Sequence, residues 1–556
     1  MKGVFNMSNR KSMPEKNTKE DKRNFHKKGR NDGNRNKRRD DAMDKSSYRE
    51  GDNDISWYSK YPQLLVAGGS FPYPYRPGMD LDLGKINGGT GITSDLAWSY
   101  RIPGVMSLLW MPSVGVSNTV TDPASVMAKE LYAKVRAKFS GSLDADAPDF
   151  VMYLMALDSV YAYIAWLKRL YRTLNAWTPQ NHALPDTLLA GFNITQTEAN
   201  DLRLNKTQLW QCINELILQS RKFVCPAVMD IFNRHYWMSD NVYLDDQTMN
   251  SQIYCFHPQG LYKLAQVAIP DDSGNTAAGL KMVGLPVQHT VTKLYEFGLS
   301  LISAIAEWDD GYTISGYLMR AFEGVPSFTV EDLGADEILA PIYSPEVLSQ
   351  IQNSFTVSDV YLTDDNLLTV AQNPATNVVV SNPQVYVTKS IADGVNLKRA
   401  MDTAKPLFSM DVDNPGAADN VIASRLNAMF TFVKEDTVTA GKIPVYVYAV
   451  DCGTEIPCAW YYKSVPAGTN EALKKNYVIP QIVVVPQGGN WEALKLAVIT
   501  QFQKCPLVRV AVQESSGGGY TCGMLGDVHN VTTVDRAMLA NLHKICLYSE
   551  FNAFSI

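Results

Sequence analysis

Two adjacent aspartates, Asp245 and Asp246, follow Tyr243 and Leu244 in a Tyr-Leu-Asp-Asp stretch. Paired carboxylates at such a position can hold two Mg²⁺ ions in line with an attacking hydroxyl, as in a reverse transcriptase. That chemistry requires a hydrophobic hairpin around the pair, but the polar stretch QTMNSQ comes next. No other polymerase motif is evident in the sequence, so the pattern indicates a surface loop.

Two further stretches have the residue types of ligand-binding loops. ESSGGGYTCGMLGD, residues 514–527, follows a predicted strand but lacks a Gly-Lys-Ser/Thr, and Cys522 stands where G-x-G-x-x-G requires its third glycine. It therefore predicts a tight loop or hairpin. DVDNPGAADNVI, residues 411–422, begins like a calcium loop, but Ile422 occupies the twelfth position, where a bidentate glutamate is required.

The seven histidines and eight cysteines are scattered along the chain. None of them forms an H-x-x-x-H, a C-x-x-C or a Cys/His cluster with metal-ligand spacing, and there is no G-x-S-x-G nucleophile elbow. The sequence thus predicts no enzyme, no cofactor, no metal and no small-molecule ligand. The first residues, MKGVFNMSNRKS, lack the apolar run of a signal peptide, which predicts reduced cysteines in a cytosolic setting.

The strongest chemical signal in the sequence is its charge. Residues 1–39 contain fourteen Lys and Arg against four Asp and Glu, a net charge of +10, whereas the rest of the chain carries −16. The few apolar residues of this segment cannot offset the entropy of ordering it, so residues 1–55 are predicted to form a disordered arm. A flexible polycation binds phosphates without sequence preference. The residues predicted to contact nucleic acid are Lys22, Arg23, Lys27, Lys28, Arg30, Arg35, Lys37, Arg38 and Arg39.

Two other interpretations of the arm stay open. It could be a solvated tail without a partner, or it could hold a nuclear import signal around residues 35–39.

The body that carries the arm has strong helix signals at residues 122–141, 146 to about 177, 207–223, 293–308 and 535–551. FVMYLMALDSVYAYIAWL, residues 150–167, is long enough to cross a bilayer. A charge in mid-span is costly in lipid, and Asp158 lies there, so we predict a buried core helix and no membrane partner.

After about residue 325 the sequence favours strands. FTVEDLG (328–334), residues 353–370 and residues 377–390 are β-branched runs interrupted by Asp, Asn and Pro, which predicts a smaller, more solvated domain over 326–440. Residues 443–452 predict a strand, and 478–513 predict a strand, a helix capped by Asn490 and a second strand. Helix should outweigh strand, and the fold class is α+β.

An aromatic strip lies between the arm and the first helix signal, in a stretch that is also rich in Gly and Pro. Because Tyr and Trp dominate contact energetics, such a strip could anchor the chain across a neighbouring subunit. Packing of the same rings on the subunit's own core is the alternative. The predicted interface residues, called the aromatic strip below, are Trp57, Tyr58, Tyr61, Phe71, Tyr73 and Tyr75.

Two stretches of this body, LLVAGGSFPYPYRPG (64–78) and VMYLMALDSVYAYIAWLKRLYRTLN (151–175), follow a basic N-terminus. In this layout the chain resembles the capsid protein of picobirnaviruses, small viruses with a segmented double-stranded RNA genome. The resemblance implies a mainly helical shell domain (residues 56–325 and 441–556) and a projecting domain at the dimer (326–440). It also implies an icosahedral shell of symmetric homodimers, sixty per shell, and an arm that faces double-stranded RNA.

The same resemblance implies a location in the virion, with assembly in the host cytoplasm. From the residues alone a second function is open, a non-viral RNA-binding or ribonucleoprotein module that does not form shells.

Overall fold

The computed structural model describes residues 55–86 and 96–554, except for short internal stretches. Those stretches are 103, 249, 270–273, 358–359, 364–366, 390–400, 402, 439–442, 464–475, 480, 490–495, 498 and 516–517. The chain divides into two units, Met1–Pro74 and Tyr75–Ile556, and each is described by itself. In the smaller unit the described elements are a 3₁₀ turn, η2 (Ile55–Trp57), and helix α2 (Pro62–Gly69).

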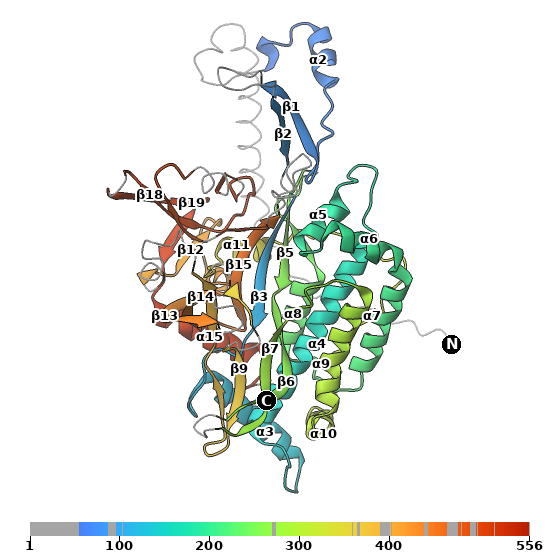
Figure 1. The fold of residues 1–556 in the computed structure, drawn as a ribbon, viewed down its shortest axis with the longest axis vertical. Coiled ribbons are helices and arrows are strands. Elements are labelled where there is room, and N and C mark those ends of the chain that lie inside the picture. Colours follow the sequence, from blue (N-terminus) through green and yellow to red (C-terminus); the bar gives the residue numbers. More distant parts are fainter. Residues whose placement is uncertain are drawn as a thin grey trace, which may run out of the picture. The chain divides into compact units, whose positions relative to one another are not determined.

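Helix α4, Ala147–Leu174, is the central element of the larger unit (Figure 1). Pro148 lies in its first turn, and the carboxylate of Asp149 accepts the backbone N–H of Asp146, as expected of a capped helix start. The helix ends three residues before the predicted limit at Trp177. Its length and hydropathy would suffice for a membrane span, but the apolar window is completely buried within the protein. The prediction of a core helix is confirmed.

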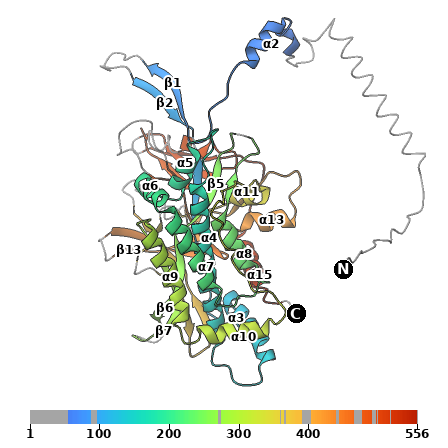
Figure 2. The ribbon, with the colours of Figure 1, turned by 90° about the vertical axis from the view of Figure 1, so that its right-hand side faces the viewer.

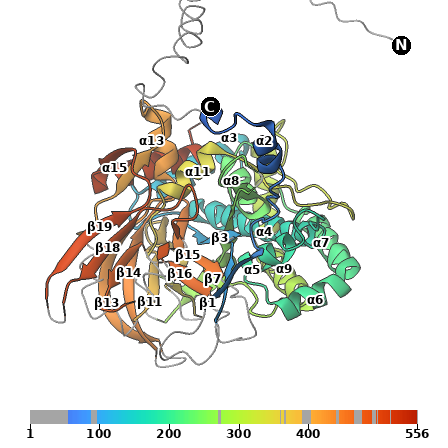
Figure 3. The same cartoon turned by 90° about the horizontal axis from the view of Figure 1, so that it is seen from above.

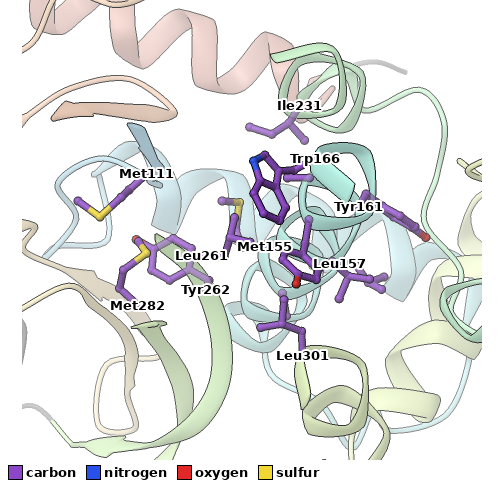
Figure 4. Packing of buried hydrophobic residues seen from close by; sticks show 14 of the residues in the cluster. Met111, Met155, Leu157, Tyr161, Trp166, Ile231, Leu261, Tyr262, Met282 and Leu301 are labelled. Carbon is purple, nitrogen blue, oxygen red and sulfur yellow. The ribbon is translucent and has the colours of Figure 1, made fainter. Parts of the chain in front are cut away.

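Side chains on every face of α4 are packed. Figure 4 shows Met155 and Leu157 of this helix in one buried cluster with Leu261, Met282 and Leu301 from other elements. Burying a side chain of this size contributes about 1.5–3 kcal/mol relative to leaving it exposed. A helix with apolar residues on all faces and no polar stripe has to be buried on all sides, and α4 has this pattern.

Several aromatic side chains of α4 bury polar atoms that have hydrogen-bond partners, although among the described residues the buried hydroxyl of Tyr161 has none. The hydroxyl of Tyr163 donates to the carbonyl of Leu294 at 2.7 Å, and Nε1 of Trp166 donates to Nδ1 of His257 at 3.2 Å. Buried Tyr and Trp need such partners because an unpaired polar atom in a core is costly.

Several helices pack around α4, and Figure 2 shows α4, α7, α8 and α9 running side by side. The helices predicted at 122–141, 207–223, 293–308 and 535–551 are all present with slightly different limits, and the first ends before Gly141. The remaining helices of the larger unit whose limits fall within the described residues are α3 (Pro123–Lys138), α5 (Leu184–Gly191), α6 (Gln196–Leu204), α7 (Lys206–Ser220), α8 (Asp230–Asp240), α9 (Val291–Ala306), α10 (Gly311–Ala321), α11 (Pro345–Gln352), α13 (Ala417–Ser424) and α15 (Arg536–Glu550).

The central sheet has the order β16-β15-β3-β5-β4, with β3 and β5 parallel and the other pairs antiparallel. In Figure 1 its strands β3 and β5 lie beside the helices around α4. Its strands are β3 (Val105–Pro112), β4 (Val242–Leu244), β5 (Ile253–Pro258), β15 (Glu455–Lys463) and β16 (Asn476–Ile479).

Two four-stranded antiparallel sheets follow, with the orders β10-β9-β7-β6 and β13-β14-β11-β8. Their strands are β6 (Gly260–Ala268), β7 (Thr276–Gly284), β8 (Val360–Tyr361), β9 (Thr369–Asn373), β10 (Val378–Ser381), β11 (Gln384–Thr388), β13 (Met429–Val438) and β14 (Ile443–Asp451). The predicted strands within 353–370, 377–390 and 443–452 are confirmed.

Three smaller sheets are also present among the described residues. They pair β1 (Asp80–Ile86) with β2 (Leu96–Arg101), β12 (Leu407–Met410) with β20 (Asn530–Thr533), and β18 (Val508–Gln513) with both β17 (Ile482–Val485) and β19 (Tyr520–Leu525). Strands β17 and β18 are parallel, as the predicted strand-helix-strand unit requires, whereas its cap Asn490 lies outside the described residues. Strands β18 and β19 form the hairpin predicted for the glycine-rich stretch.

The strand predicted at 328–334 is wrong. This segment runs over the helices, and helix side chains take the place of a neighbouring strand as donors to its carbonyl groups. Lys168 of α4 donates to the carbonyl of Glu331 at 2.9 Å, and Trp210 of α7 donates to that of Leu333 at 2.7 Å. The β-branched composition was correct for an extended chain, but pairing depends on what lies beside it.

The predicted domain limits at 325/326 and 440/441 cross the sheets of the larger unit. Strand β9 pairs with β7, which precedes residue 326, and β11 pairs with β14, which follows residue 440. Residues 326–440 therefore share their sheets with the rest of the larger unit. Which part of this unit projects stays a prediction.

Candidate functional sites

The predicted nucleic-acid-binding residues, Lys22 to Arg39, lie outside the described residues. Their role stays a prediction that rests on charge. The rest of the chain, residues 40–556, has a net charge of −16, which is opposite in sign to the charge of residues 1–39.

The aromatic strip is exposed. Five of its residues lie in the smaller unit and Tyr75 lies in the larger one. The exposed fraction of these six residues ranges from 39% for Trp57 to 81% for Tyr73, and none of residues 55–75 is buried. Helix α2 lies within this stretch and adds the exposed aliphatic side chains of Leu64, Leu65 and Val66. The role of the strip at a subunit interface stays a prediction.

The Tyr-Leu-Asp-Asp stretch does not lie on a surface loop, so that prediction is wrong in part. Tyr243 is buried in β4, and Asp245 is buried directly after that strand. The Asp245 carboxylate accepts the hydroxyl of Ser251 at 2.9 Å and the backbone N–H groups of Gln252 and Gln503 at 2.8 and 3.2 Å. The bonds from Ser251 and Gln252 close the turn between β4 and β5, and the bond from Gln503 holds a later segment against this turn, so the carboxylate is a structural acceptor.

Among the described residues, no group of three or more His, Cys, Asp or Glu side chains is arranged to hold a metal ion. All eight cysteines are free thiols. Five of them are buried and two are partly buried, while Cys522 is exposed.

Ionic side chains that are far apart in sequence meet inside the larger unit. Nδ1 of His235 on α8 lies 2.5 Å from Oδ2 of Asp158 on α4. Nε2 of the same ring lies 3.4 Å from Oε1 of Glu455, the first residue of β15. All three side chains are at most 1% exposed. In a general base Nε2 would face a nucleophile, but here it faces the carboxylate of Glu455. The His235 ring therefore has a structural role, since it connects α8 to α4 and β15.

Two arginines complete this ion network. Arg234 on α8 contacts the carboxylate of Glu455. Arg425, which follows α13, lies 3.6 Å from Glu455 and 2.7 Å from Glu550 at the end of α15. Together with Asp158 and His235, three carboxylates thus face two guanidinium groups and one imidazole. Burying charges costs several kcal/mol per ion unless they are paired, and this network pairs all six.

The electrostatics of the network depend on these pairings. Burial alone would lower the pKa of His235, but the carboxylates of Asp158 and Glu455 outweigh it and raise this pKa to about 9. Burial likewise favours a neutral Glu455, yet Arg234, Arg425 and His235 hold its pKa well below its usual value. Burial raises the pKa of Asp158, and the contact with His235 opposes this shift. With His235 protonated and the three carboxylates ionised, the charges of the network balance.

Sequence reasoning missed this network. Asp158 in a helix that is apolar on all sides was the one signal available, because a lone carboxylate in such a setting needs a buried partner. The partner could not be named, since His235 and Glu455 are distant in sequence.

Comparisons with known proteins agree with the resemblance seen in the sequence. The sequence model of the family described as "Picobirnavirus, Capsid protein" matches residues 57–471. A capsid protein precursor of a human picobirnavirus is 26% identical over 524 residues, which cover 90% of this chain and 91% of that protein. The X-ray structure of a picobirnavirus capsid shares the fold, with a TM-score of 0.72 and 21% identity over 90% of this chain and 99% of that one. The chain belongs to the picobirnavirus capsid protein family.

Proposed function

We propose that this chain assembles as symmetric homodimers, sixty per shell, into an icosahedral capsid that encloses double-stranded RNA. In this proposal the basic arm faces inward and binds RNA without sequence preference, and assembly takes place in the host cytoplasm. Family membership supports a structural role in the virion. The sixty homodimers, the double-stranded RNA and the cytoplasmic assembly are what the family resemblance implies, whereas self-assembly through the aromatic strip and RNA binding by the arm are argued from the residues.

The observation that carries self-assembly is the exposure of the aromatic strip. Monomeric proteins rarely expose contiguous apolar patches of more than a few hundred Å², and each large aromatic ring can bury roughly 150–250 Å². Trp57, Tyr61, Phe71 and Tyr73 lie within 17 residues of one another, and the strip contains no charged residue besides Lys60. We propose that a neighbouring subunit covers these rings.

The charge of the arm supports RNA binding. Each phosphate that a Lys or Arg neutralises releases counterions, so about ten contacts would make the affinity fall steeply as salt rises. A coil of about 50 residues has a root-mean-square span of roughly 40 Å, which lets it reach phosphates well away from its root.

The RNA proposal is tested with particles purified from cells and measured for RNA by the ratio of absorbance at 260 and 280 nm. Deletion of residues 1–45 should leave assembly intact and remove the co-purifying RNA. A second variant replaces the nine predicted contact residues by Gln, which lowers the net charge of residues 1–39 from +10 to +1 and keeps the length. Particles of either variant that package as much RNA as the unaltered chain would refute the role of the arm.

We also propose that the projecting part lies within 326–440. Because its strands pair with β7 and β14, it would be an extension of the body and not a separately folded domain. An epitope tag inserted at residues 374–377, the turn between β9 and β10, should be accessible to antibody on intact particles. Binding only after disassembly would contradict this placement.

A further inference from the structure

Strand β19 forms an open edge on the larger unit. It is the outermost strand of the described sheet β17-β18-β19 and pairs on one side with β18. Residues 520–524 are all exposed, and Figure 3 shows the β18–β19 hairpin at the rim of the body. A strand with one unpaired side presents a row of N–H and C=O groups that can bind a further strand.

The pairing with β18 determines which groups are free. The backbone N–H of Glu514 donates to the carbonyl of Gly519 at 3.0 Å, which makes residues 514 and 519 a hydrogen-bonded pair at the hairpin turn. Bonded and non-bonded pairs alternate along antiparallel strands. The N–H and C=O groups of Tyr520, Cys522 and Met524 therefore point away from β18, toward the open side.

This edge lacks the protection that exposed edges usually carry. Strand β13 is also outermost in its sheet, but it presents Lys434, Glu435 and Asp436, and charges of this kind block edge-to-edge pairing. By contrast, residues 515–526 contain no charged side chain. A row without cations is also a poor surface for RNA, because phosphate binding depends on Lys and Arg.

We infer that β19 pairs antiparallel with β19 of a second copy of this chain, across a two-fold axis that passes through Cys522. This inference rests on the proposed self-assembly and assigns one of its contacts. An uncharged edge is compatible with its own copy, since no like charges meet, and a two-fold axis matches donors to acceptors on both chains. The register in which all three outward-facing residues find a partner places Cys522 opposite Cys522 and Tyr520 opposite Met524.

The register makes a geometric prediction. Hydrogen-bonded residues opposite each other in an antiparallel pair have Cα atoms about 5.5 Å apart. Disulfides span Cα distances of roughly 4.4–6.8 Å, so the two Cys522 thiols would lie within bonding reach. Both side chains are on one face of the joined sheet, together with Tyr520 and Met524.

The first test treats the full chain with copper phenanthroline, which takes two electrons and two protons from each pair of thiols. We expect a covalent dimer on a non-reducing gel. Cys522→Ser should abolish this dimer, whereas Cys546→Ser, which removes a partly buried thiol on α15, should leave its yield unchanged. An undiminished dimer in Cys522→Ser would overturn the inference.

The second test examines the register through charge. Tyr520→Lys combined with Met524→Lys places lysine opposite lysine twice, which should weaken the contact by about two-fold to thirty-fold. Tyr520→Lys combined with Met524→Glu places lysine opposite glutamate and should restore the cross-linking yield. Equal yields from the two double variants would refute this register.

Particle formation separates this inference from the proposed function. Shells that form normally without any Cys522 cross-link would remove the β19 contact and leave the capsid proposal intact. A Cys522-linked dimer in a chain that never forms shells would support the contact and contradict the shell.

Discussion

Aromatic side chains occupy two opposite environments in this protein. On α4, Tyr163 and Trp166 are at most 1% exposed and their polar atoms are paired within the core. In the aromatic strip, Tyr61 and Tyr73 are 75% and 81% exposed. Both regions are rich in aromatic and aliphatic residues, so this content alone does not decide which rings are inside. The difference is that α4 presents apolar residues on all faces of one long buried helix, whereas the strip lies in a Gly- and Pro-rich stretch whose short helix α2 has no buried residue.

Apolar side chains in these two regions are assigned two different purposes. Those on α4 stabilise the fold of one subunit, and we propose that those in the strip stabilise the contact between subunits. Matched substitutions at buried and exposed positions should separate the two purposes.

The largest effect is expected from the buried ion network. Glu455→Ala leaves Arg234 and Arg425 without their shared carboxylate and should lower the free energy of unfolding by about 3–5 kcal/mol. The matched exposed change is Asp332→Ala, which breaks a surface pair with Arg221 and should cost at most about 1 kcal/mol. Urea unfolding followed by circular dichroism measures both, and equal losses would show that the network is not a major source of stability.

Tryptophan substitutions compare the core with the strip directly. Trp166→Ala removes a fully buried ring and should cost about 3–5 kcal/mol in unfolding free energy. Trp57→Ala removes an exposed ring and should change that free energy by at most about 0.5 kcal/mol while reducing particle yield. If Trp57→Ala destabilised the subunit as much as Trp166→Ala, the strip would belong to the core.

A pH dependence should follow from His235. Its pKa in the folded protein is about 9, higher than the usual 6.5, so the folded protein binds this proton more tightly than the unfolded chain does. The corresponding stabilisation is fully present below pH 6.5 and is lost as pH rises through 9; by this shift it amounts to about 3 kcal/mol. Unfolding free energies measured between pH 6 and 10 should fall in this window. His235→Gln should remove that slope, and a slope unchanged in the variant would assign it to other groups.

The smallest effects are expected at the paired aspartates. Asp245→Asn replaces a buried acceptor of three hydrogen bonds and should cost about 1–3 kcal/mol. Asp246→Asn, at the half-buried neighbour, should lie within about 0.5 kcal/mol of the unaltered chain. Thermal unfolding measures both changes. A loss of nucleotide transfer in Asp246→Asn would instead reveal a catalytic role for the pair.

Local patterns in the sequence predicted much of this fold. Caps and apolar periodicity identified helices such as α3, α4 and α7, and the β-branched run of residues 377–390 identified β10 and β11. The segment 328–334 was misread because its partners are side chains of α4 and α7, which no local pattern specifies. The ion network was missed for the same reason, since Asp158, His235 and Glu455 meet only in the folded chain.

The candidate sites differ in how far the sequence could specify them. The charge of the arm is a property of composition, so it could be predicted without a structure. The open edge of β19 could not be predicted in this way. The glycine-rich stretch indicates a hairpin, but it does not indicate which of the two strands lacks a neighbour on its outer side. Exposure of the aromatic strip likewise required the structure, since the same rings would also suit a core.

The central claim, that the strip joins subunits and does not stabilise the subunit itself, is tested most directly by sedimentation velocity. The comparison uses the unaltered chain and a variant with Trp57, Tyr61, Phe71 and Tyr73 replaced by Ser. We predict megadalton particles for the unaltered chain and slowly sedimenting small species for the variant, at equal unfolding free energy. Particles of the same size and yield from the variant would contradict the claim.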